Sequence, residues 1–279
     1  MEINRRQLSK TMLASIAVGQ ATILSAGAKA DAGSTILTSC TLVVDAATGA
    51  IIRRQGPCGQ AFSPCSSFKL AIAAMGFDAG VLADPHHPRL EYRPEYGAQA
   101  DRDKKAVDPT IWLADSIVWY SQQITLGLGM DRFRGYVDQF AYGNRDLTGN
   151  PGENDGLTQA WLMSSLQISP DQQVDFIKRL LDGQLGITDH AFAMLDATVP
   201  VYGGAGGWSI RGKSGSGWLR SESGAYDMNR PQGWFVGWAD NGLQRVIFAR
   251  LRVGRVATDV PGGTTARLEV REQLETWVR

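Results

Sequence analysis

The sequence has no excess charge of either sign, because 28 lysines and arginines balance 28 aspartates and glutamates. Nucleic-acid-binding proteins usually carry a basic excess or a basic stripe. The balance therefore argues against a nucleic-acid partner and fits a small-molecule ligand. Histidine is also scarce, with three in the chain, of which His86 and His87 are adjacent. Adjacent side chains rarely point the same way and no third ligand is in view, so we expect no metal site.

Long apolar runs, internal repeats and heptads are missing too, which argues against membrane spans, solenoids and coiled coils. The longest apolar stretch, 12–26, follows a basic segment and precedes Ala28-Lys29-Ala30. This order is typical of a secretory signal, and Arg5-Arg6 also resembles a twin-arginine export signal. The alternative is an amphipathic first helix. We predict a signal peptide over 1–30, a mature domain over 31–279, a periplasmic location and no remaining membrane anchor.

Cysteine is nearly absent, and its odd number leaves one thiol unpaired in an oxidising compartment: the chain has Cys40, Cys58 and Cys65. Cys40 and Cys58 flank an expected hairpin that turns at Thr48-Gly49, so they can lie opposite each other. Cys65 adjoins Ser66, and a buried free thiol is the favoured interpretation there. The spacing alone does not settle the pairing.

The hydrophobic pattern predicts two strands, a mostly helical middle, three further strands and a last helix. The expected strands are 38–44, 51–52, 207–213, 233–238 and 243–253, and the expected helices are 68–77, 109–128, 131–140, 170–181 and 264–278. Ser169, Pro170 and Gln172 give the clearest helix start, with a cap, a first-turn proline and a capping box. Grouped strands predict an α+β fold, in which a central antiparallel sheet of N- and C-terminal strands is flanked by helices and joined by a mostly helical subdomain.

Ser66-Ser67-Phe68-Lys69 has the S-x-x-K form at the start of an apolar helix. Residues three apart share one helix face, so Ser66 and Lys69 are within side-chain reach. An apolar setting disfavours the ammonium form, and a neutral lysine can act as a base toward a serine hydroxyl. The motif occurs often by chance, and the alternative is a lysine that extends to solvent from a helix start.

Three further short elements gain meaning from their order. Lys213-Ser214-Gly215 offers a cation, a hydroxyl and a glycine that permits close approach at a sheet edge. Taken alone, it is equally a strand-to-turn junction. Ser116-Ile117-Val118 reads as a helix interior and Tyr142-Gly143-Asn144 as a turn. Penicillin-recognising enzymes combine S-x-x-K with K-T-G.

In this order the elements resemble those of the class D β-lactamases. Ser66 to Lys69 resembles the family's S-T-F-K element and Lys213 to Gly215 its K-T-G element, each with serine replacing threonine. Three other matches are Ser116-Ile117-Val118 to S-x-V, Tyr142-Gly143-Asn144 to Y-G-N, and Gly233-Trp234-Phe235-Val236-Gly237-Trp238 to a late W-x-V-G-W strand. Trp161-Leu162 with Ile168-Ser169-Pro170 resembles the middle segment. The resemblance covers about 36–275, and both replacements keep the hydroxyl.

The resemblance implies a catalytic role for each of five residues. Ser66 would be the acylated nucleophile. Lys69 would carry carbon dioxide as a carbamate and act as the general base for acylation and deacylation. Trp161 would donate its indole N–H to that carbamate. Ser116 would relay protons to the leaving nitrogen, and Val118 would help to keep the pocket dry.

The resemblance also implies how a substrate would be held. The backbone N–H groups of Ser66 and Ser216 would form the oxyanion hole. The implied substrate-binding residues are Lys213, Ser214, Gly215, Tyr142 and Arg267, with Arg271 as the fallback for the arginine. The expected activity is hydrolysis of penicillin- or cephalosporin-type antibiotics through a serine acyl-enzyme, which gives resistance. The expected partner is a small-molecule β-lactam, bound by a monomer or a homodimer.

Three alternatives remain open at this point. A β-lactam sensor of the same fold would be acylated without turnover, although such domains usually hang from a membrane helix. A transpeptidase acting on cell-wall peptides usually carries extra domains or an anchor. A non-catalytic secreted binding protein would use the tryptophan-rich surface, but it has no need of a buried lysine beside a serine.

Overall fold

The computed structural model describes residues 35–98 and 100–279. The predicted signal peptide over 1–30 lies outside these residues. The strands are β1 (Ile36–Asp45), β2 (Ile51–Gln55), β3 (Val201–Gly203), β4 (Ser209–Arg220), β5 (Tyr226–Asp240) and β6 (Arg245–Gly254). The helices are α1 (Lys69–Asp78), α2 (Pro109–Asp115), α3 (Val118–Leu128), α4 (Met130–Gln139), α5 (Gly156–Gln159), α6 (Pro170–Leu181), α7 (Asp189–Thr198) and α8 (Gly262–Val278), and the short 3-10 helix η1 (Cys65–Phe68) precedes α1.

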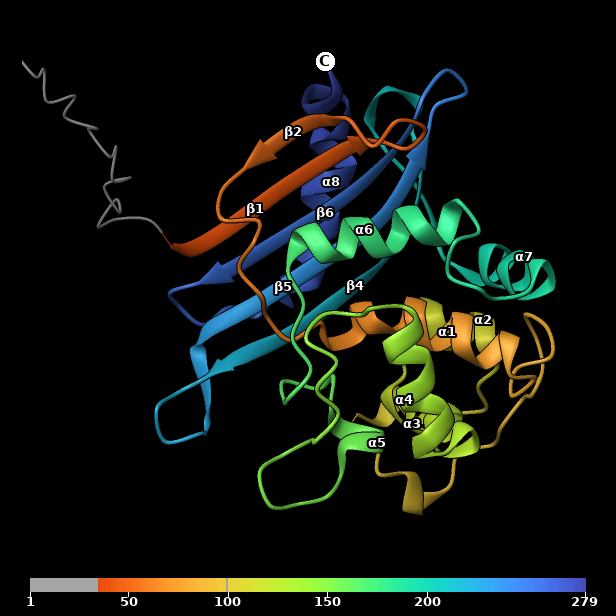
Figure 1. The fold of residues 1–279 in the computed structure, drawn as a ribbon. Coiled ribbons are helices and arrows are strands. Elements are labelled where there is room, and N and C mark those ends of the chain that lie inside the picture. Colours follow the sequence, from red (N-terminus) through yellow and green to blue (C-terminus); the bar gives the residue numbers. More distant parts are fainter. Residues whose placement is uncertain (1–34, 99) are drawn as a thin grey trace, which may run out of the picture. The chain divides into compact units, whose positions relative to one another are not determined.

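The strands form one antiparallel sheet in the order β2-β1-β6-β5-β4-β3 (Figure 1). The first strand of the chain pairs with the last, so Cys40 lies opposite Leu251. The predicted α+β fold, with N- and C-terminal strands in one sheet, is confirmed.

Helices cover both faces of the sheet (Figure 1). α8 packs on one face, where Val270 and Leu274 join a buried cluster with Phe235 and Phe248 of β5 and β6. α6 packs on the other face, and the remaining core continues from there into the helical subdomain around α1. In the described part of the chain, no helix is both long and apolar enough to cross a bilayer.

One predicted helix is wrong in its continuity. The expected helix over 109–128 is divided into α2 and α3, because Ser116 takes a left-handed conformation with φ 64° and Ile117 is extended. Asp108 caps α2 by accepting a hydrogen bond from the Ile111 N–H. The break places Ser116 at a helix junction rather than in a helix interior.

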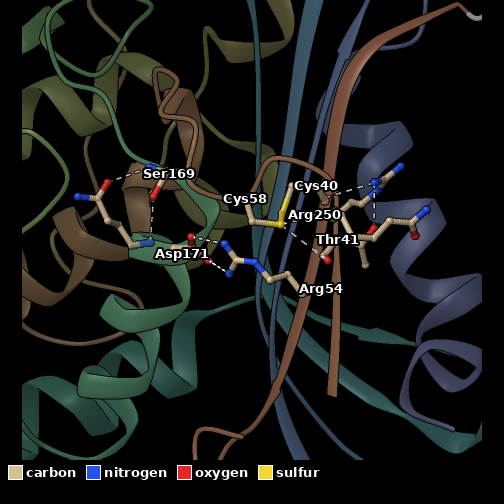
Figure 2. The surroundings of a disulfide bond; sticks show 9 residues. Cys40, Thr41, Arg54, Cys58, Ser169, Asp171 and Arg250 are labelled. Carbon is tan, nitrogen blue, oxygen red and sulfur yellow. Dashed lines mark hydrogen bonds and ion pairs between the residues drawn. A yellow bond between two sulfur atoms is a disulfide. The ribbon is translucent and has the colours of Figure 1, made fainter. Parts of the chain in front are cut away.

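The chain just before the helical part is fastened by a disulfide bond. Cys40 of β1 is bonded to Cys58, which follows β2 (Figure 2). Among the described residues, Cys65 is a buried free thiol. The pairing that the sequence left open is thereby resolved. Beside it, Arg54 of β2 forms an ion pair with Asp171 in the first turn of α6.

Candidate active site

Ser66 lies in the tight 3-10 turn that leads into α1. Cys65 has a positive φ of 49°, and the Ser67 hydroxyl donates to the Pro64 carbonyl at 2.8 Å. The structure therefore places Ser66 one turn before the start of the α-helix. The sequence predicted Ser66 in the first turn of that helix. Because Lys69 begins α1, the two side chains share one face, and Lys69 Nζ lies 2.8 Å from Ser66 Oγ.

The Lys69 ammonium is strongly disfavoured by its surroundings. The residue is 0% exposed, and α1 is buried from Lys69 to Phe77. Burial lowers the pKa of Lys69 to about 7, although electrostatic interactions with Cys65 and Asp103 partly oppose this. An unprotonated amine is therefore accessible near neutral pH, within hydrogen-bond distance of the serine hydroxyl.

Ser116 and Lys213 form a second serine–lysine pair. Lys213 Nζ donates to Ser116 Oγ at 2.9 Å, across 97 positions of sequence. Lys213 is 3% exposed. Its pKa is lowered well below the usual value by burial, and by the positive charges of Lys69 and Arg267. The left-handed turn between α2 and α3 presents the Ser116 side chain to this lysine.

The edge of β4 carries the expected oxyanion donor. β3 covers β4 only at Ser209–Arg211. Gly212 N–H donates to Pro200 O on that side, and Trp218 N–H donates to Met163 Sδ, so alternate N–H groups point away from β5. By the same alternation, the Ser214 and Ser216 N–H groups face this edge.

Gly215 lets β4 approach the turn that holds the nucleophile. A Cβ at this position would lie 2.6 Å from Pro64 O and 2.9 Å from Ser67 N. Any larger residue would therefore push the strand away from η1. The structure shows a close approach of Gly215 to the Ser66 turn. The predicted close approach of a ligand at Gly215 stays a prediction.

A cavity of about 530 Å³ opens over these groups. Among the predicted site residues, its lining includes Ser66, Ser116, Val118, Ser214, Ser216 and Arg267. The Arg267 guanidinium lies over the Tyr202 ring at 4.9 Å, and its buried Nε has no hydrogen-bond partner among the described residues. Arg271 instead donates to Gly203 O, so the geometry favours Arg267 as the anchor for an anionic substrate group.

Five predicted site residues are buried and do not line the cavity: Lys69, Lys213, Gly215, Tyr142 and Trp161. Tyr142 is 1% exposed, and its hydroxyl donates to Gln173 Oε1 at 3.4 Å. Gln173 in turn donates to Ser67 Oγ, so Tyr142 supports the nucleophile turn and does not reach the cavity. Trp161 is fully buried, and its ring centre lies 5.7 Å from that of Phe68. Within residues 35–98 and 100–279, its Nε1 has no hydrogen-bond partner.

Sequence reasoning missed Asp103, Gln173 and Ser63. Asp103 lines the cavity, and its carbonyl accepts a hydrogen bond from Trp119 Nε1 at 2.8 Å. The segment around Asp103 reads as a charged loop, so no local signal marks it. Ser63 and Gln173 act through hydrogen bonds to residues about one hundred positions away in the sequence. Short sequence motifs contain no information about such distant contacts.

The fold and the paired serine–lysine geometry define a penicillin-recognising protein. The family model of the penicillin binding protein transpeptidase domain matches residues 39–255. The chain is 49% identical to β-lactamase OXA-9 of Klebsiella pneumoniae over 236 residues. The aligned region covers 84% of this chain and 86% of that protein. The chain belongs to the class D serine β-lactamases.

A solved structure and a second relative agree with this membership. The crystal structure of the class D β-lactamase OXA-427 matches with a TM-score of 0.78 and 39% identity, over 84% of this chain and 95% of that one. β-Lactamase OXA-1 of Escherichia coli is 28% identical over 240 residues, which are 85% of this chain and 84% of that protein.

Proposed function

We propose that this enzyme hydrolyses the amide bond of penicillin- and cephalosporin-type antibiotics through an acyl-enzyme on Ser66, and thereby confers resistance to them. The observation that carries this proposal is the 2.8 Å contact between Ser66 Oγ and the buried amine of Lys69. A binding protein gains nothing from an amine whose pKa is lowered beside a hydroxyl, whereas an acyl-transfer enzyme needs this arrangement to generate its nucleophile.

The positions of the side chains support the following reaction. The base at Lys69 takes the proton of Ser66, and Oγ attacks the β-lactam carbonyl carbon. The N–H groups of Ser66 and Ser216 stabilise the oxyanion. As the C–N bond breaks, the ring nitrogen receives a proton through Ser116, which is hydrogen-bonded to Lys213. Water then cleaves the ester, releasing the acid and restoring the serine.

The residues around Lys69 fit a carbamate formed from carbon dioxide. Carboxylation needs an unprotonated amine, and the pKa of Lys69 near 7 provides one. A carbamate also needs donors, and the unpartnered Trp161 Nε1 is a buried donor beside Phe68, the residue before Lys69. When bound, the group supplies an anionic base at the end of the lysine side chain. Lys69 would hold it, and Trp161 would donate a hydrogen bond to it.

The cavity accounts for the remaining substrate contacts. β-Lactam antibiotics of these types carry a carboxylate beside the ring nitrogen. Arg267 and Ser214 line the cavity, and the positive charge of Arg267 is close enough to lower the pKa of Lys213. We assign recognition of the substrate carboxylate to Arg267, Ser214 and Lys213.

We also propose that the mature chain is exported to the periplasm after cleavage near Ala30. The Cys40–Cys58 disulfide supports this location, because such bonds persist in oxidising compartments and are rare in the cytosol. The target compounds also act outside the inner membrane, where a secreted enzyme meets them first.

The test is turnover of a chromogenic cephalosporin by purified protein, with and without added bicarbonate. We expect sustained turnover that bicarbonate raises and that Ser66→Ala abolishes. Ser67→Ala is the neighbouring control, because Ser67 Oγ is hydrogen-bonded to Pro64 and Gln173 and does not line the cavity. It should therefore retain measurable turnover. A single stoichiometric burst without further turnover would overturn hydrolysis in favour of a sensor.

A further inference from the structure

Ser63 joins the nucleophile turn to the segment that carries Trp161. It is 5% exposed and directly precedes Pro64. Its hydroxyl donates to Trp161 O at 2.9 Å and accepts a hydrogen bond from Met163 N–H at 2.9 Å. One side-chain oxygen therefore bridges both ends of the Trp161–Met163 turn.

The backbone of Ser63 is itself fixed to the sheet. Its carbonyl accepts from Gln232 Nε2 and from Trp234 Nε1, each at 2.9 Å. Both donors belong to β5, and both side chains are essentially unexposed. Ser63 is thus hydrogen-bonded to the sheet through its carbonyl and to the Trp161 turn through its hydroxyl, so it holds the turn in a fixed position relative to the sheet.

The far side of the same turn is held by β4. Met163 has a positive φ of 56°, which a side chain with a Cβ adopts only under constraint. Arg220 Nε donates to Met163 O at 2.8 Å, and Trp218 N–H donates to Met163 Sδ at 3.1 Å. Because that side is fastened to β4, the Ser63 hydroxyl decides how the Trp161 end lies relative to α1.

We propose that Ser63 is a positioning residue whose hydroxyl sets the place of the Trp161 indole, which packs against Phe68, the residue before Lys69, and with it the affinity of Lys69 for carbon dioxide. The inference rests on the proposed carbamate at Lys69. Ser63 touches neither the substrate nor the reacting atoms: it acts through the backbone of Trp161 and Met163. Without the Ser63 hydroxyl, the Trp161 turn is free to shift. The indole N–H is then no longer held in the position from which it would donate to the carbamate.

The chain offers a closely matched control. Ser165 Oγ also bridges two backbone groups, accepting from Gly149 N–H and donating to Asp146 O, each at 2.9 Å. It lies in the same segment, but its hydroxyl does not bind the Trp161 turn. Ser165→Ala therefore removes the same two kinds of hydrogen bond as Ser63→Ala. A third variant, Ser63→Thr, keeps the hydroxyl and tests rescue.

The experiment titrates full-length mature protein, freed of carbon dioxide, with ¹³C-labelled bicarbonate and follows the ¹³C resonance of the carbamate. Thermal unfolding of each variant is measured in parallel. We expect Ser63→Ala to need about tenfold more bicarbonate for half-saturation, the size of effect that loss of an orienting outer contact has at a metal ligand. Ser165→Ala and Ser63→Thr should stay within about twofold of the unsubstituted protein.

The outcomes separate this inference from the function on which it rests. If the unsubstituted protein binds the label and Ser63→Ala binds it equally well, Ser63 is only structural and this inference alone is overturned. An equal weakening in Ser165→Ala would likewise attribute the effect to general loosening. If the unsubstituted protein shows no carbamate resonance, the carbamate proposal and this inference both fail.

Discussion

At the scale of single residues, the site depends on two lysines that are withdrawn from water. Lys69 and Lys213 are each almost completely buried, and each lies within 3 Å of one serine hydroxyl. Burial lowers the pKa of both, and their mutual repulsion, with that of Arg267, adds to the effect at Lys213. Burying two lysines beside an arginine is costly in a fold, but the arrangement suits an anionic ligand.

The pH dependence of hydrolysis tests the state of Lys69. The pKa of Lys69 is lowered to about 7, so the protonated amine prevails below that pH and can neither accept the Ser66 proton nor take up carbon dioxide. At a fixed concentration of dissolved carbon dioxide, kcat/KM should fall about tenfold per pH unit below pH 7. A profile that stays flat from pH 5.5 to 8 would contradict the assignment.

Lys213→Arg provides the control for this pH profile. An arginine carries a positive charge and does not lose its proton in the range measured. The overall rate should drop, because the hydrogen bond to Ser116 changes, but the acid limb near pH 7 should remain. If the limb disappears in Lys213→Arg, Lys213 rather than Lys69 is the titrating group.

At the scale of elements, the sequence predicted the structural features that depend on residues close together in the chain. The Ser66–Lys69 contact follows from three-residue spacing, and the Ser169 capping box is present as expected. The prediction of one continuous helix through Ser116 was wrong, because the apolar pattern continues through this position and nothing local signals a left-handed serine. The pairing of Ser116 with Lys213 spans 97 positions and was not predicted: the family resemblance singled out both residues but not their contact.

The capping box of α6 gives a prediction at this scale. Ser169 Oγ accepts from Gln172 N–H, and Gln172 Oε1 accepts from Ser169 N–H. Ser169→Ala removes the cap and should lower the free energy of unfolding by about 1 kcal/mol. Urea denaturation followed by circular dichroism measures it. Ser169→Thr retains a capping hydroxyl, so its free energy of unfolding should fall much less. If both variants lose the same amount of stability, the loss in Ser169→Ala does not come from the missing cap.

At the scale of the whole molecule, the site exists only where distant parts of the chain meet. Its cavity lies between the open edge of β4 and the start of the helical subdomain, so Ser66 and Ser216 come together only when the sheet is complete. The grouping of strands at the two ends of the sequence predicted this sheet. The roles of Gly215 and Tyr142 were not predictable, because both depend on which surfaces pack together: Gly215 against η1, and Tyr142 against Phe68.

The Cys40–Cys58 disulfide gives the prediction that belongs to the whole fold. It joins β1 to the segment that leads to Ser66, across a sequence separation of 18 (Figure 2). A crosslink of that span restricts the unfolded chain and should contribute about 3 kcal/mol to the free energy of unfolding. Urea denaturation should therefore show a lower midpoint with a reducing agent than without it. A Cys40→Ala/Cys58→Ala variant should have the low midpoint under both conditions, because it has no bond to reduce. An unchanged midpoint on reduction, with both thiols shown to be free, would mean that the arrangement of β1 and β2 does not depend on the crosslink.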